Sequence, residues 1–133
     1  MSAEAVVIRN APTSDHLRMQ KQALQLVSKL RYVSGQFVPY LRDGIWLSNA
    51  RRANELAQQL TSELRRTLGD KLVLTQPVQT NQIFCLLAKD IRHKLRANGH
   101  IFYDWPSQPD EVRFVTSWDN TERDIAHLIA NMA

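Results

Sequence analysis

Cysteine is nearly absent from this sequence. One cysteine, Cys85, among 133 residues excludes a disulfide framework within the chain and favours a reducing compartment. We therefore expect a cytoplasmic protein. Because Cys85 stands in an apolar run, we expect it to be a buried, inert thiol rather than a nucleophile.

Glycine is also scarce. The four glycines are scattered, so the sequence has no glycine-rich phosphate loop and no nucleophile elbow. The four histidines, His16, His93, His100 and His127, do not stand at ligand spacing with Cys85 or with a carboxylate. The sequence therefore predicts no metal site and no catalytic residue of its own.

Long hydrophobic runs and a strong charge imbalance are missing as well. No apolar run is long enough to span a membrane, and the first residues lack the ordered charged and apolar regions of a signal peptide. Seventeen Lys and Arg against thirteen Asp and Glu give a net charge of +4. That mild excess is not a nucleic-acid signature by itself, so we expect no nucleic-acid or membrane partner.

The first third of the chain has helical periodicity. Apolar residues at spacings of three and four predict one long bridging helix over residues 16–41, after a short strand at 5–8. Gly35 and Pro39 should bend or interrupt that helix. Its apolar surface, from Leu17 to Phe37, is wider than one stripe, which indicates a helix packed on more than one side or against a second chain. We expect this surface to be exposed and to drive self-association.

A second helix is predicted from Asp43-Gly44 to Leu68, with Gly69 as its C-terminal stop. One stripe of apolar residues runs along it: Trp46, Ala50, Ala53, Ala57, Leu60, Leu64 and Leu68.

The remainder alternates short strands and helices. Strands are predicted at 72–74, 82–87, 101–105 and 111–118, and helices at 90–98 and after Thr121. Thr121 and Asp124 have the spacing of a capping box. The predicted class is α+β: two long N-terminal helices followed by a small, mostly antiparallel sheet with helices on one face. We expect a single domain over residues 1–133, made of an N-terminal strand and bridging helix (1–41) and a small α+β part (42–133).

Arg113 is the residue that the pattern singles out. In the strand 111–118, Val112 and Phe114 point to one face, and Arg113 and Val115 point to the other. A guanidinium beside an apolar neighbour needs an anion or water. The pattern alone leaves two interpretations: an edge-strand surface arginine paired with Glu111 or Asp110, or a fork that binds a carboxylate ligand.

Four segments in register resemble the C-terminal part of the threonine aldolase-like enzymes, beta-eliminating lyases of the fold-type I pyridoxal phosphate (PLP) group. The opening residues Ala3-Glu4-Ala5-Val6-Val7 are similar to a family segment too, so the resemblance covers essentially the whole chain. The segments are Ser28-Lys29-Leu30-Arg31-Tyr32, Asp43-Gly44-Ile45-Trp46-Leu47, Gln79-Thr80-Asn81-Gln82-Ile83-Phe84 and Val112-Arg113-Phe114-Val115-Thr116-Ser117.

The resemblance implies roles for residues of this chain. Arg113 matches the arginine that holds the substrate α-carboxylate, and Arg31 matches an arginine that reaches the PLP phosphate. Lys21 and Lys29 are weaker candidates. Asn81 is interpreted as a structural turn residue. The chain departs from the family at Ala23-Leu24, where many members carry a glycine pair.

The resemblance further implies that the cofactor ring, its nitrogen-binding carboxylate and the Schiff-base lysine belong to a large domain preceding this part. The chain would then begin just after the catalytic lysine, as a truncated product or a separately made domain. We expect PLP in the complete enzyme but no covalent binding by this chain alone. The expected function is part of an aldolase that cleaves β-hydroxy-α-amino acids to glycine and an aldehyde, inactive alone, with the large domain or a partner subunit completing it. The alternative is a non-catalytic interaction or dimerisation module with a basic surface.

Overall fold

The computed structural model describes residues 3–10 and 13–132. The chain divides into two compact units, Met1–Trp46 and Leu47–Ala133, and each is considered by itself. The single domain expected from the sequence stays a prediction.

Unit 1 contains three short helices, α1 (Thr13–Gln22), α2 (Leu30–Ser34) and α3 (Phe37–Arg42). The prediction of one long helix over 16–41 is therefore wrong. The chain leaves the helical conformation at Leu24 and Lys29, whose φ angles are 55° and 66°, because left-handed residues cannot continue a right-handed helix. Helices in proteins are held chiefly by packing, and every residue from 21 to 30 is exposed in the structure.

The predicted breakers act differently. Gly35 is the C-cap of α2, and its N–H donates to the carbonyl of Arg31 over 2.8 Å. Pro39 instead lies in the first turn of α3, where its missing N–H costs no helical hydrogen bond.

The strand predicted at residues 5–8 is also wrong. Residues 3–9 have no regular secondary structure, and Val6 and Val7 are 85% and 89% exposed. A strand requires a neighbouring strand for its backbone hydrogen bonds. The sheet of the described chain is built from unit 2 alone.

The second helix is confirmed as α4 (Ile45–Leu68). It follows Gly44, whose φ is 66°, and ends at Gly69, whose φ is 54°, where the short 3-10 helix η1 (Gly69–Lys71) begins. Positive φ at both ends explains why glycine stands there. The buried residues of α4 are Ala53, Leu56, Ala57, Leu60, Thr61 and Leu64.

The sheet has four strands in the order β1-β2-β4-β3. They are β1 (Val73–Leu74), β2 (Gln82–Leu86), β3 (Tyr103–Asp104) and β4 (Glu111–Val115). All three pairings are antiparallel, so the predicted class and sheet type are confirmed. β4 is an inner strand between β2 and β3, although those two strands are separated by a helix in the sequence.

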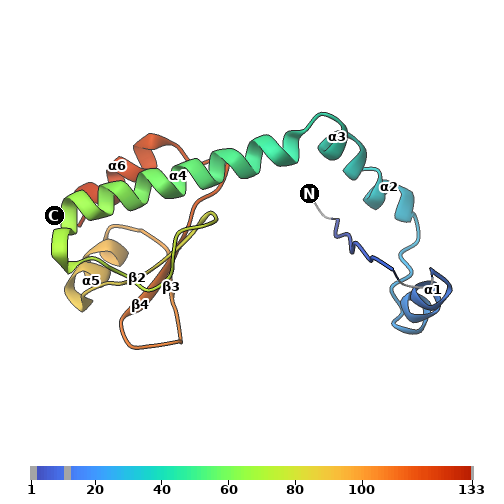
Figure 1. Cartoon of the computed structure of the whole chain (residues 1–133), viewed down its shortest axis with the longest axis horizontal. Coiled ribbons are helices and arrows are strands. Elements are labelled where there is room, and N and C mark those ends of the chain that lie inside the picture. Colours follow the sequence, from blue (N-terminus) through green and yellow to red (C-terminus); the bar gives the residue numbers. More distant parts are fainter. Residues whose placement is uncertain (1–2, 11–12, 133) are drawn as a thin grey trace. The chain divides into compact units, whose positions relative to one another are not determined.

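One face of this sheet packs on helices. The helices are α4, α5 (Lys89–Ala97) and α6 (Glu122–Ala130), and Figure 1 shows α4 and α6 next to each other over the sheet. The predicted capping box of α6 is present, with Thr121 and Asp124 bonded to each other's backbone N–H. The shared core includes Leu56, Leu60, Leu64, Ile83, Cys85, Leu95, Val112, Phe114, Ile125 and Ile129.

The other face of the sheet is more open. Phe84, Leu86 and Arg113 alternate with the core residues and are half-buried, whereas Val115 is 50% exposed. This alternation follows from the period of two along a strand. It places Arg113 on the face opposite the helices, as the strand pattern predicted. In the described part of the chain no helix is long and apolar enough to cross a membrane.

Candidate anion site on the open face of the sheet

Arg113 lies in the middle of the open face. It is directly opposite Phe84 of β2 on one side and Tyr103 of β3 on the other. Two ladders of backbone hydrogen bonds therefore fix the position of its Cα on an inner strand, and sites built on paired strands are positioned more accurately than sites on loops.

Aromatic rings surround the guanidinium. Its Cζ lies 4.7 Å from the ring centroid of Trp105 and 5.1 Å from that of Tyr103. Trp105 is held in turn by an edge-to-face contact with Phe84, with centroids 5.2 Å apart and planes at 72°. Cation–π contacts of this kind contribute about 0.5–1 kcal/mol each at exposed sites.

The guanidinium has no anionic partner among the residues that the structure describes. In the described part of the chain, no carboxylate lies within ion-pair distance of Arg113. Its Nε is buried without a hydrogen-bond partner, a state that costs free energy because the donor has lost water and gained nothing. An anion that reached this nitrogen would remove that cost.

Glu111, two residues earlier on the same face of β4, is not the partner of Arg113. It is 2% exposed, and its two carboxylate oxygens accept hydrogen bonds from the hydroxyls of Thr75 and Ser107. These donors, Ser107 first, hold the pKa of Glu111 below its ordinary value because they stabilise the ionised form. The interpretation of Arg113 as a surface arginine paired with its neighbours does not describe the structure.

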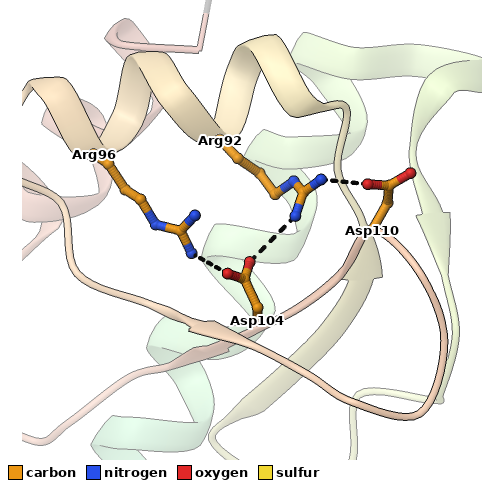
Figure 2. A network of polar contacts seen from close by, with 4 residues as sticks. All are labelled: Arg92, Arg96, Asp104 and Asp110. Atoms are coloured by element: carbon orange, nitrogen blue, oxygen red, sulfur yellow. Dashed lines mark hydrogen bonds and ion pairs between the residues drawn. The ribbon is translucent and has the colours of Figure 1, made fainter.

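The nearby aspartates are occupied as well. Asp104 of β3 accepts from Arg96 over 2.7 Å and from Arg92 over 3.3 Å, and Asp110 pairs with Arg92 (Figure 2). Hydrogen bonds from Arg96 are the first cause of the lowered pKa of Asp104. These pairs bind α5 to β3 and to the turn that leads into β4.

Arg31 and Lys29, the predicted phosphate contacts, lie in unit 1. Both are exposed. Arg31 donates to the Tyr32 hydroxyl over 3.3 Å, and Lys29 precedes α2 in a left-handed conformation. They are two positive charges two residues apart, and neither has a carboxylate partner within the described residues. Their predicted role stays a prediction.

Asn81 and Cys85 have structural surroundings. The Asn81 side chain donates to the carbonyl of Thr116 over 2.7 Å, a structural contact at the end of the β2–β4 ladder. Cys85 is buried, and burial together with the charge of Glu111 raises its pKa to about 12. Among the described residues, no group of three or more His, Cys, Asp or Glu side chains could hold a metal.

Sequence reasoning missed the surroundings of Arg113. Tyr103 and Trp105 alternate in a predicted strand, which is a signal that both side chains share a face. No sequence signal connects Thr75 with Glu111, because their proximity depends on the β1-β2-β4 strand order.

Relatives of this chain were found among known proteins, although no family model matches it. It is 34% identical over 130 residues to a low-specificity L-threonine aldolase of a Pseudomonas species. The aligned residues cover 97% of this chain and 37% of that protein. It is 33% identical over 117 residues to the low-specificity L-threonine aldolase of Pseudomonas aeruginosa, covering 87% of this chain and 33% of that protein.

Solved structures show the same fold. A threonine aldolase of Leishmania major superposes with a TM-score of 0.76 at 23% identity, over 92% of this chain and 35% of that one. A glycine decarboxylase (P-protein) of the glycine cleavage system superposes with a TM-score of 0.53 at 19% identity, over 63% of this chain and 20% of that one.

The chain spans about a third of the length of the curated relatives it matches. Its identity to them extends over most of its own residues and agrees with the resemblance seen in its four sequence segments. The chain is thus a homologue of one part of the low-specificity L-threonine aldolases.

Proposed function

We propose that this chain is the C-terminal part of a PLP-dependent, threonine aldolase-like lyase, and that Arg113 holds the α-carboxylate of the amino-acid substrate. The observation that carries the proposal is the guanidinium of Arg113, which is fixed on an inner strand and has no carboxylate partner among the described residues. A carboxylate is the ligand that matches a guanidinium fork, through two parallel charge-assisted hydrogen bonds.

The residues of this chain fit the two anionic ends of such a reaction. Arg113 suits the substrate carboxylate, and the exposed pair Arg31 and Lys29 suits the cofactor phosphate. When bound, PLP supplies the electron sink for breaking the carbon–carbon bond. None of the lysines of this chain matches the family's Schiff-base position: Lys21, Lys29, Lys71, Lys89 and Lys94.

The role of Arg113 is therefore orientation. Two hydrogen bonds from Arg113 to the carboxylate would fix the orientation of the amino acid and so would select which bond at its Cα is presented to the cofactor. Holding a reactant in a productive geometry lowers the entropic part of the barrier. The rings of Tyr103 and Trp105 limit the movement of the guanidinium and exclude water from part of it.

The chain alone should not cleave β-hydroxy-α-amino acids, because positioning groups without a cofactor lysine supply no electron sink. The test is incubation with PLP, borohydride reduction and peptide mapping, together with an assay for glycine release from threonine. We expect only scattered modification of exposed lysines. One stoichiometrically modified lysine with PLP-dependent turnover would contradict the proposal.

A chimera tests the role of Arg113. The preceding part of the Pseudomonas aeruginosa enzyme, joined to this chain, should release glycine from threonine. Arg113→Lys removes at least one charge-assisted hydrogen bond worth about 1.5–3 kcal/mol, so kcat/KM should fall by about 10- to 100-fold. The matched control is Arg123→Lys, at an exposed position of α6, which should leave kcat/KM unchanged. Equal effects of the two substitutions would remove the support for Arg113 as the carboxylate ligand.

A further inference from the structure

We propose that Thr75 and Ser107 are positioning residues that hold Glu111 away from Arg113 and so keep its guanidinium free for an external carboxylate. The identity of that carboxylate as an amino-acid substrate rests on the function proposed above. The separation of the two side chains does not rest on it, because it concerns only the described residues of unit 2.

Glu111 is the anion that Arg113 would be expected to find first. The two residues share one face of β4, and alternate residues of a strand are about 6.6 Å apart along it. The guanidinium is nearer to Trp105, at 4.7 Å, than to Tyr103, at 5.1 Å, although Tyr103 is the residue directly opposite Arg113. Trp105 is hydrogen-bonded through its backbone N–H to the Glu111 carbonyl over 2.8 Å, so the ring nearest to the guanidinium belongs to the residue opposite Glu111.

Two hydroxyls from opposite sides hold the Glu111 carboxylate instead. Thr75, which follows β1, donates to Oε1, and Ser107, in the connection from β3 to β4, donates to Oε2. Each hydroxyl carries one donor proton, so each oxygen of the carboxylate has its own donor. A hydrogen bond to a neutral hydroxyl is weaker than one to a guanidinium. The Glu111 carboxylate therefore pairs with two hydroxyls, although the guanidinium of Arg113 would be a stronger donor.

The other two carboxylates, in β3 and in its connection to β4, also have partners other than Arg113. Asp104 and Asp110 pair with Arg92 and Arg96 of α5 (Figure 2). All three acidic residues between Tyr103 and Arg113 thus have partners other than Arg113. A carboxylate of the chain that paired with Arg113 would compete with an external carboxylate for the same guanidinium. Holding that internal carboxylate away raises the affinity of Arg113 for an external one without adding any contact.

The isolated chain can report on this arrangement through phenylglyoxal, which modifies free guanidinium groups faster than paired ones. The rate at Arg113 is measured by peptide mapping and is normalised to Arg123, which is exposed on α6. In Thr75→Val/Ser107→Ala, we expect Glu111 to pair with Arg113. The normalised rate should fall about fivefold, the factor that corresponds to an ion pair of ~1 kcal/mol.

A third substitution separates this effect from a structural one. Adding Glu111→Gln to the double variant removes the competing charge and should restore the rate at Arg113. The control is Ser62→Ala, which deletes an exposed hydroxyl bonded to the Gln58 carbonyl of α4 and should leave the rate unchanged. Circular dichroism verifies the fold of each variant. If the double variant does not fold, Ser107→Ala with and without Glu111→Gln carries the same test.

The outcomes are distinct. A lowered rate that Glu111→Gln restores supports the proposal. An unchanged or faster rate in the folded double variant overturns it, and so does a lowered rate that Glu111→Gln fails to restore. Addition of glycine to the wild-type chain then examines the function separately. If glycine does not protect Arg113 while the variants behave as expected, the separation of Glu111 from Arg113 stands and the assignment to an amino-acid carboxylate fails.

Discussion

Replacement of Arg113 by methionine should make the isolated chain more stable. The guanidinium carries a buried Nε without a partner and a positive charge with no carboxylate in ion-pair distance among the described residues. A residue kept for binding an absent ligand is one that the fold tolerates at a cost. Methionine has a similar length and no polar hydrogen, so it removes the cost and keeps most of the packing.

The magnitude follows from two opposing contributions. An unsatisfied buried donor costs about 1–3 kcal/mol, which Arg113→Met recovers. The contacts of the guanidinium with Tyr103 and Trp105 contribute about 0.5–1 kcal/mol each, and a thioether against the same rings returns about 0.3–1.5 kcal/mol each. The two ring terms roughly cancel, and the free energy of unfolding should rise by about 1 kcal/mol.

Urea unfolding followed by far-ultraviolet circular dichroism is the suitable assay, because the fluorescence of Trp105 would change with its neighbour. The midpoint should rise with an unchanged m-value. In a thermal scan, 1 kcal/mol corresponds to about 4–8 °C for a domain of 60–100 residues.

Arg92→Met is the matched control. Arg92 also has a buried Nε without a partner, but its terminal nitrogens pair with Asp104 and Asp110 and its side chain is 15% exposed. Its loss recovers the same Nε cost but removes ion pairs to two half-exposed carboxylates, worth up to about 1 kcal/mol each, so Arg92→Met should gain clearly less stability than Arg113→Met. A gain in Arg113→Met no larger than that in Arg92→Met would refute the reasoning, since it would mean that Arg113 has a stabilising role within the chain itself.

Three further predictions concern other parts of the chain. Leu24 and Leu26 are 87% and 59% exposed in unit 1, so the chain should self-associate in sedimentation velocity and Leu24→Ser/Leu26→Ser should shift it toward monomer; a monomeric wild-type chain at high concentration would contradict this. Burial, and then the neighbouring His127, lower the pKa of His100, so stability should decline as the pH falls below the unfolded value of about 6.5. His100→Gln should flatten that decline in urea midpoints measured across this range, and an unaltered slope would speak against it. Thr121→Ala removes the capping box of α6 and should cost about 1 kcal/mol in the same unfolding assay, where a loss near zero would show that the cap is dispensable.

The sequence predicted unit 2 well because its signals are local and agree with one another. Alternation along 111–118 identified β4 and its two faces, and the Thr121 cap identified the start of α6. The stripe of α4 was displaced at its N-terminal end: Trp46 and Ala50 are exposed, whereas Leu56, outside the stripe, is fully buried. Periodicity determines which residues share a face of a helix, but the extent of burial depends on where the sheet ends.

Unit 1 shows what periodicity does not determine. The apolar residues of 16–41 recur at helical spacing, yet the chain breaks at Leu24 and Lys29, two residues that give no signal for positive φ. The resemblance places Leu24 where many members of the family carry one of two glycines, and glycine adopts this conformation without strain. The departure noted in the sequence therefore coincides with a left-handed residue in the structure.

The candidate site was predicted in its central residue only. Strand alternation identified Arg113. In the proposal above, however, Glu111 is held away from Arg113 by Thr75, which stands 36 residues before Glu111 in the sequence. Contacts across that distance are created by strand order, and strand order is not encoded in any one segment.

The single thiol of the chain has a practical consequence. Cys85 lies on β2 directly opposite Val112, is 0% exposed, and has a pKa raised to about 12. An alkylating reagent needs an exposed thiolate, so the native strand should be almost unreactive near neutral pH, whereas an opened chain reacts at the rate of a free cysteine. The labelling rate of Cys85 therefore measures how often the sheet beside Arg113 opens, with no probe added to the protein and no second cysteine to confuse the reading.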